Sequence, residues 1–185
     1  MQTDRLIPHP DKPPLAVTAI HARITGITEH WLTLRWSVAG SGRVVLPALA
    51  GKRRVDGLWH HTCFELFVQS PDSDSYIELN LSPCEGWAAY DFAGYRQAMA
   101  RRAMPRQPDC TARIGGNTLI FDAAVPIAAL PARPWRAGLM AVIEEEGGVM
   151  SYWSLPHSPG PNSSTAPDFH QASCRALTVP APRAT

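Results

Sequence analysis

The sequence predicts an all-β protein, a single-domain antiparallel β-sandwich of about nine or ten strands. Short runs alternate apolar and polar residues with the two-residue period of a strand. Gly, Pro, Asn and Ser separate these runs at short intervals, as turns do. The length of 185 residues fits one domain, and no internal repeat divides it. We expect an arm at residues 1–14, the sandwich at 15–180 and a tail at 181–185.

Three strands are expected in the first part of the chain. Residues 1–14 contain four prolines and have polyproline character, so we expect an arm that lies loosely on the domain. Residues 15–25 and 31–38 alternate apolar and polar side chains. Residues 43–48 are predicted to form a further strand, which Pro47 places at an edge or a strand end.

The central stretch, residues 56–96, contains the clearest pair of strands. A turn at 70–75 separates two alternating runs, which are predicted to form a hairpin. One face of this hairpin is apolar, and it comprises Phe64, Leu66, Val68, Ile77, Leu79 and Leu81. The other face is mixed, and it comprises Trp59, Cys63, Glu65, Phe67, Tyr76, Glu78 and Asn80.

The remaining elements follow from turn signals and local propensity. Residues 95–104 contain good helix formers and predict one or two helical turns. Two hairpins are predicted at 110–125 and 135–155, each around a glycine-containing turn. A short helical turn at 126–130 and a last strand at 174–179 complete the fold.

Composition argues against several classes of protein. The 17 Lys and Arg residues nearly balance the 16 Asp and Glu residues, so no nucleic-acid partner is expected. The N-terminus lacks the apolar core of a signal peptide and no apolar run is long enough to span a membrane, which together predict a cytoplasmic protein. The four cysteines form no Cys-x-x-Cys pair, so neither zinc nor a disulfide framework is predicted.

A ligand site is predicted on the mixed face of the hairpin. Trp59, Trp87 and Trp153 are candidate platforms for a sugar ring, with burial in the core as the alternative for each. Glu65, Glu78 and Asn80 would bond its hydroxyl groups. Arg53 or Arg54, from the basic loop before the hairpin, would close the rim of the site.

Other chemistries remain as alternatives. Glu65 and Glu78 could act as the acid and base of glycoside hydrolysis. His157, Asp168 and His170 are weak evidence for zinc or iron, because a polar loop separates them, and no metal is predicted. No cofactor is predicted, with calcium and haem as open alternatives. Haem would require an axial pair such as Met with His, for which the available methionines are Met99, Met104, Met140 and Met150.

Five segments resemble a bacterial family of DOMON-like domains, which is similar to family 9 carbohydrate-binding modules. These segments are 56–67, 76–83 and 86–92, together with the late residues 152–155 and 167–170. The resemblance implies a jelly-roll-like β-sandwich that binds a sugar or haem at one end or face of a sheet.

The resemblance also implies roles for particular residues. Trp59 and Glu65 match a tryptophan and an acidic residue that bind sugar in the modules. Trp153, or alternatively Phe169, matches the second aromatic residue of a clamp. Asn80 and either Arg53 or Arg54 are placed with the sugar-bonding Asn and Arg side chains by neighbourhood alone.

The resulting prediction is a non-catalytic domain that binds a saccharide or a sugar-containing metabolite on a sheet face. A haem-binding domain and a glycoside-acting enzyme are the alternatives, and a protein partner is a further one. The Pro- and Ser-rich loop at 156–167 would either cover the site or leave it open.

Overall fold

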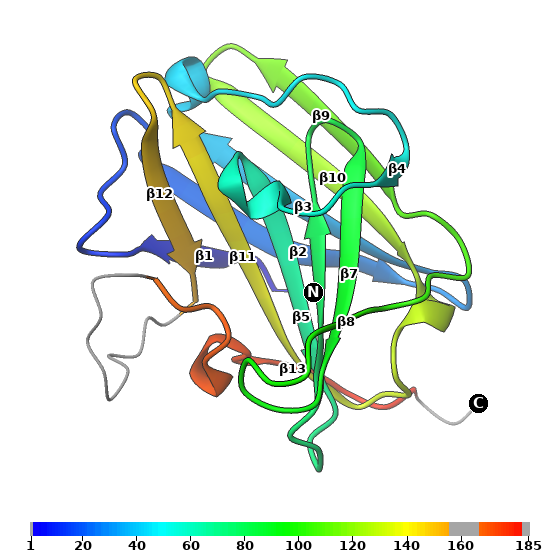
Figure 1. The fold of residues 1–185 in the computed structure, drawn as a ribbon. Helices are drawn as coiled ribbons and strands as arrows, with labels where there is room; N and C mark the ends of the chain where they lie inside the picture. The colour runs from blue at the N-terminus through cyan, green and yellow to red at the C-terminus, as the bar shows by residue number, and fades with distance from the viewer. Residues whose placement is uncertain (1, 156–166, 183–185) are drawn as a thin grey trace.

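The computed structural model describes residues 2–155 and 167–182 and shows an all-β protein (Figure 1). Its strands form two layers, named here sheet A and sheet B. Sheet A contains, in spatial order, β1 (Asp4–Pro8), β2 (Ala19–Ile27), β3 (Trp31–Ala39), β10 (Thr118–Pro126) and β9 (Asp109–Gly115).

Sheet B is larger and carries the candidate site. Its strands are, in order, β4 (Arg53–Arg54), β7 (Gly86–Phe92), β6 (Tyr76–Leu81), β5 (Cys63–Gln69), β11 (Trp135–Glu145) and β12 (Val149–Ser154). β8 (Ala100–Arg101) pairs with β7, and β13 (Leu177–Val179) pairs with β11. All named strand pairs are antiparallel except β4 with β7. The sandwich is therefore confirmed, with more strands than the sequence predicts.

β1 joins the two sheets. Its first residues pair with β2, so that Leu6 lies opposite Ile20, while Ile7 pairs with Ser154 of β12. The hydrogen-bonded ladder thus runs from one sheet into the other, and the layers form one curled sheet. The expected loose arm at residues 1–14 therefore contains a strand.

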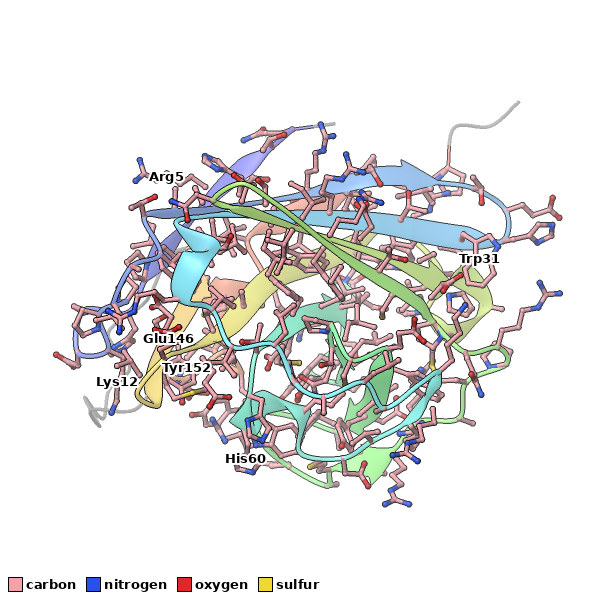
Figure 2. All side chains as sticks on the ribbon, turned by 90° about the horizontal axis from the view of Figure 1, so that it is seen from above. Arg5, Lys12, Trp31, His60, Glu146 and Tyr152 are labelled. Carbon is pink, nitrogen blue, oxygen red and sulfur yellow. The ribbon has the colours of Figure 1, made fainter. Side chains whose placement is uncertain are left out.

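The core lies between the two layers, which Figure 2 shows from above. Alternate residues of β3 face it, so Leu32, Leu34, Trp36 and Val38 are buried while their neighbours are half-buried. Phe64 of sheet B stacks on Phe121 of sheet A, with ring centroids 4.4 Å apart. This contact and the burial of apolar area around it hold the sheets together.

The outer face of sheet B, which points away from sheet A, is also covered. A second cluster of buried side chains lies there, formed with residues from the segment before β5 and from the C-terminal segment. β5 and β6 are consequently buried on both faces along nearly all their length. The mixed face of the hairpin is therefore an interior surface rather than a solvated one.

Two predicted elements are wrong, for identifiable reasons. Residues 43–48 do not form a strand; Val44 makes one isolated bridge to Glu145, after the 3-10 turn η1 (Ser41–Arg43). Residues 95–104 form no helix, because Arg96 and Ala98 have positive φ angles that an α-helix cannot contain.

Three further 3-10 turns occur, η2 (Leu58–His60), η3 (Ile127–Ala129) and η4 (Ala172–Cys174), and η3 confirms the predicted turn at 126–130. Both later hairpins are confirmed as β9–β10 and β11–β12. In the part of the chain described here, no helix has the length and apolar character needed to cross a membrane.

Candidate functional site

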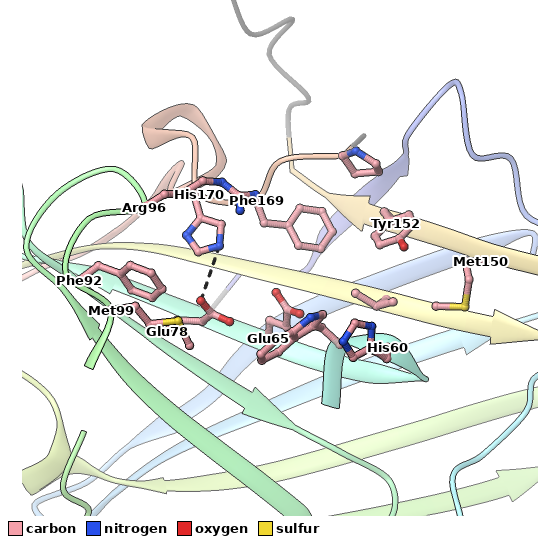
Figure 3. Close-up of a pocket in the computed structure, with 13 residues that line it drawn as sticks. His60, Glu65, Glu78, Phe92, Arg96, Met99, Met150, Tyr152, Phe169 and His170 are labelled. Carbon is pink, nitrogen blue, oxygen red and sulfur yellow. Dashed lines mark ion pairs between the residues drawn. The ribbon is translucent and has the colours of Figure 1, made fainter. Parts of the chain in front are cut away.

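Two carboxyl groups form the floor of a pocket on the outer face of sheet B (Figure 3). Glu65 comes from β5 and Glu78 from β6, and the strand register places Glu65 opposite Asn80, two residues along from Glu78. Because the neighbours of each glutamate face the inter-sheet core, the strand period turns both carboxyls to the outer face. The pocket has a volume of about 570 Å³.

Aromatic rings stand on two sides of this floor. Trp59 of η2 contacts the edge of Tyr90, with ring centroids 6.1 Å apart. Tyr152 of β12 and Phe169 meet edge to face at 6.2 Å. Met99 and Met150 also line the pocket. The walls therefore offer apolar surfaces above a polar floor.

Glu78 is held in place by one amide. Nδ2 of Asn80 donates a hydrogen bond of 2.7 Å to Oε1 of Glu78. Burial raises the pKa of Glu78 to about 6, although the bond from Asn80 and the charge of Arg96 act against this rise. At neutral pH Glu78 is therefore mostly an oriented carboxylate.

Glu65 has no such support. Its side chain is only 3% exposed, and no described residue donates a hydrogen bond to its carboxyl group. Burial, and then the nearby charge of Glu78, raise the pKa of Glu65 well above its ordinary value. Glu65 therefore resists ionisation, and it has hydrogen-bonding capacity that the described chain does not use.

His170 closes one end of the pocket in neutral form. Its Nδ1 lies 2.7 Å from the hydroxyl of Tyr76, and its Nε2 lies 3.7 Å from Oε2 of Glu78. Burial, followed by repulsion from Arg96, lowers the pKa of His170 to about 4. The contact with Glu78 is therefore not an ion pair at neutral pH. The backbone N–H of Arg96 donates to the Tyr76 hydroxyl, which leaves the phenolic hydrogen for Nδ1.

Asp168 fixes the C-terminal segment over the pocket. Its carboxylate accepts a 3.0 Å hydrogen bond from Nη2 of Arg96, and further bonds from Tyr95 and Gln171. Burial alone would raise the pKa of Asp168, but the bonds from Tyr95 and Arg96 outweigh burial and lower it. This network positions Phe169 and His170 beside the two glutamates.

The structure brings some of the predicted site residues together. Trp59, Glu65 and Glu78 line the pocket. Asn80 is fully buried beside the floor, where it orients Glu78 without lining the pocket itself.

The other two predicted tryptophans lie elsewhere. Trp87 is 6% exposed and Trp153 is 2% exposed, and both belong to the core between the sheets. Trp87 pairs with Leu81 across β6 and β7, so it shares the core face of Leu81. Neither indole reaches the pocket, contrary to the prediction.

The two arginines of β4 also lie outside the pocket. Arg53 is exposed. The guanidinium of Arg54 sits 4.7 Å above the Trp87 ring and donates to the carbonyl groups of Ala89 and Arg102. Arg54 therefore holds the β7 region together, and the cation at the pocket is Arg96 instead.

Few of the other residues that line the pocket could be predicted from sequence patterns. Tyr152 and Val142 could be found from the β11–β12 hairpin, where they pair directly and alternate with core residues. Phe169 is the alternative aromatic residue of the family resemblance. From the sequence, Arg96 is one of three arginines, with Arg53 and Arg54, that could neutralise the carboxylates of this face. No sequence signal places the rest, which are His60, Phe92, Met99, Met150, Pro167 and His170.

Metal ligands do not gather among the described residues. No group of three His, Cys, Asp or Glu side chains there could hold an ion. Asp168 and His170 are engaged with Arg96 and Tyr76, while His157 and most of the loop at 156–167 lie outside the described residues.

Comparison with known proteins finds similarity in structure but not in sequence. No family model and no curated protein matches the chain. A proposed carbohydrate-binding protein from Bacteroides uniformis has the same fold, with a TM-score of 0.61 at 14% identity, over 94% of this chain and 83% of that one. A family 9 carbohydrate-binding module from Caldicellulosiruptor kristjanssonii, in complex with glucose, aligns with a TM-score of 0.39 at 11% identity, over 73% of this chain and 65% of that one.

Proposed function

We propose that this chain is a non-catalytic binding domain for a saccharide or a sugar-containing metabolite, held in the pocket on the outer face of sheet B. One observation carries the proposal. Glu65 is nearly fully buried, lines a pocket of about 570 Å³ and has no hydrogen-bond donor among the described residues. Buried polar groups are normally paired, so an unpaired one inside a pocket of this size suggests a ligand partner.

The chemistry of the pocket suits a sugar. Trp59 on one side, and Tyr152 with Phe169 on the other, present apolar faces to a pyranose ring. The carboxyl group of Glu65 can accept a hydrogen bond and, when protonated, donate one, and the carboxylate of Glu78 can accept one. The fold shared with a proposed carbohydrate-binding protein is in keeping with this function.

The alternatives fit the floor of the pocket less well. A haem group would find Met99 and Met150 in the walls, but its apolar macrocycle would leave two buried carboxyls unpaired. Glycoside hydrolysis by Glu65 and Glu78 would require turnover. Hydrolysis of aryl glycosides that is lost in Glu65→Gln would identify an enzyme and overturn the non-catalytic proposal.

A thermal-shift screen tests the binding proposal. Monosaccharides, oligosaccharides, sugar phosphates and haem would be added separately to the full chain, and a ligand at 100 times its dissociation constant should stabilise the fold by about 2.7 kcal/mol. Trp59→Ala should abolish the saccharide shift, because a stacked indole is lost.

The matched control is Trp31→Ala. Trp31 is half-buried at the start of β3 in sheet A, away from the pocket (Figure 2). This variant should keep the full saccharide shift. A saccharide shift that survives Trp59→Ala would remove Trp59 from the site, and a screen in which no saccharide acts would refute the proposed function.

A further inference from the structure

Among the described residues, no cation forms an ion pair with the two carboxyls of the pocket floor. Glu65 and Glu78 are 3% and 6% exposed, and among the described residues no Lys or Arg lies within ion-pairing distance of either. Burial disfavours the ionised form of both carboxyls, and the charge of Glu78 adds to this effect at Glu65. The floor therefore has room for one positive charge that the described protein does not supply.

Of the described basic side chains that line the pocket, Arg96 and His170 are already engaged with other groups. Arg96 lines the pocket, but its guanidinium bonds Asp168 through Nη2 at 3.0 Å and Nε at 3.3 Å. His170 uses Nδ1 for Tyr76 and stays neutral. Neither side chain can move onto the glutamates without breaking the network that holds the C-terminal segment.

The geometry suits a small organic cation. Glu65 and Glu78 are diagonal neighbours on adjacent strands. The backbone positions of such neighbours lie roughly 7–8 Å apart across the sheet. Figure 3 shows both carboxyls projecting into the same pocket. One ammonium group between them could donate a charge-assisted hydrogen bond to each. The rings of Trp59 and Phe169 add faces that attract a cation.

We propose that the pocket selects saccharides that carry a free primary amine, such as 2-amino-2-deoxyhexoses, with the ammonium group bound between Glu65 and Glu78. This inference rests on the proposed function and narrows its ligand class. A neutral sugar would leave the carboxylate of Glu78 without a counter-charge, and a phosphorylated sugar would add a repelling one. A metal ion would obtain only two side-chain carboxyls, which is few for calcium.

Isothermal titration of the full chain tests the selectivity. Glucosamine, galactosamine and mannosamine would each be compared with the N-acetylated sugar and with the parent neutral hexose. We expect at least one free amino sugar to bind at least about tenfold more tightly than its N-acetylated form, because acetylation removes the charge. Equal or tighter binding of the neutral sugars would overturn this inference and leave the proposed function standing. No binding of any saccharide would refute both.

Substitution of Glu65 and Glu78 separates the contribution of charge to saccharide binding from that of ring stacking. Glu65→Gln and Glu78→Gln should each lower the ratio of the affinity for the free amino sugar to that for its N-acetylated form toward one. Neutral sugars should still bind against Trp59. Glu29→Gln, an exposed residue between β2 and β3, is the matched control and should keep the preference. A preference that survives both floor substitutions overturns the inference. Binding of calcium alone that either floor substitution abolishes would assign the carboxyls to a metal and overturn it as well.

Discussion

Two buried glutamates on neighbouring strands of sheet B have opposite surroundings. Glu145, at the end of β11, is fully buried, and its carboxylate accepts hydrogen bonds from the backbone N–H groups of Leu15, Ala16 and Val17 at 2.7, 2.6 and 3.1 Å. Glu65, on β5, is buried almost as deeply and receives none from the described residues.

The difference separates a structural role from a functional one. Glu145 satisfies three backbone donors and anchors the segment before β2, so its burial contributes to folding. Glu65 is buried without such bonds, which costs stability in the unliganded protein. A side chain that opposes folding at a pocket is expected to serve binding, and the following predictions test this contrast.

The largest effect is expected for Glu145→Ala. Removing the carboxylate leaves three backbone donors without their partner, and the free energy of unfolding should fall by about 3 kcal/mol. Urea denaturation measures this change. Glu146→Ala is the control, because Glu146 pairs with Arg43 at the exposed surface and should contribute under about 0.5 kcal/mol. Similar losses in both variants would contradict the anchoring role.

The next largest effect is expected in the pH dependence of the free energy of unfolding, to which Glu78 and His170 contribute. Burial raises the pKa of Glu78 from 4.5 to about 6, so its contribution to stability is complete below pH 4.5 and is lost as the pH rises through 6. Burial lowers the pKa of His170 from 6.5 to about 4, so its contribution is complete above pH 6.5 and is lost as the pH falls through 4. The two contributions oppose each other across the same range.

Glu78→Gln should therefore expose the acid sensitivity that His170 confers. Between pH 7 and 4 the unfolding free energy of this variant should fall by about 2 kcal/mol more than that of the unsubstituted protein. Urea titrations at several pH values measure the two curves. Parallel curves would show that Glu78 does not titrate in this range.

A smaller effect of opposite sign is expected for Glu65→Leu. Replacing an unpaired buried carboxyl with an apolar side chain should raise the free energy of unfolding by about 1 kcal/mol while weakening saccharide binding. Urea denaturation and isothermal titration report the two quantities. A loss of stability would mean that Glu65 has a structural partner after all.

The smallest effect is expected for Arg53→Ala. Arg53 is exposed and lies outside the pocket, so both stability and saccharide affinity should stay within about 0.5 kcal/mol of the unsubstituted protein. The same two measurements apply. A marked loss of affinity would return Arg53 to the rim of the site, where the sequence places it.

Strands with one apolar face were predictable from the sequence. The alternation in β3, β5 and β6 predicts both the strands and the faces on which Glu65 and Glu78 lie. β7 gives no such signal, because residues on both of its faces are apolar and buried. Only the pairing of Trp87 with Leu81 decides that this indole faces the core.

The walls of the pocket could not be predicted for a different reason. Arg96 and Phe169 belong to segments without strand periodicity, and their positions depend on a contact between Arg96 and Asp168 across the fold. Positive φ at Arg96 turns the chain there despite good helix propensity nearby. Local sequence therefore predicts the floor of the site, and tertiary contacts set its walls.

The double pairing of β1 has a consequence for how the protein is made. During synthesis β1 emerges before its partners in sheet B, because Ile7 pairs with Ser154 and Leu15 bonds Glu145, which lie much later in the chain. The curled sheet cannot close until β12 has left the ribosome, and its closure carries the entropy of a long loop. Until then the nascent chain keeps one edge of β1 unpaired.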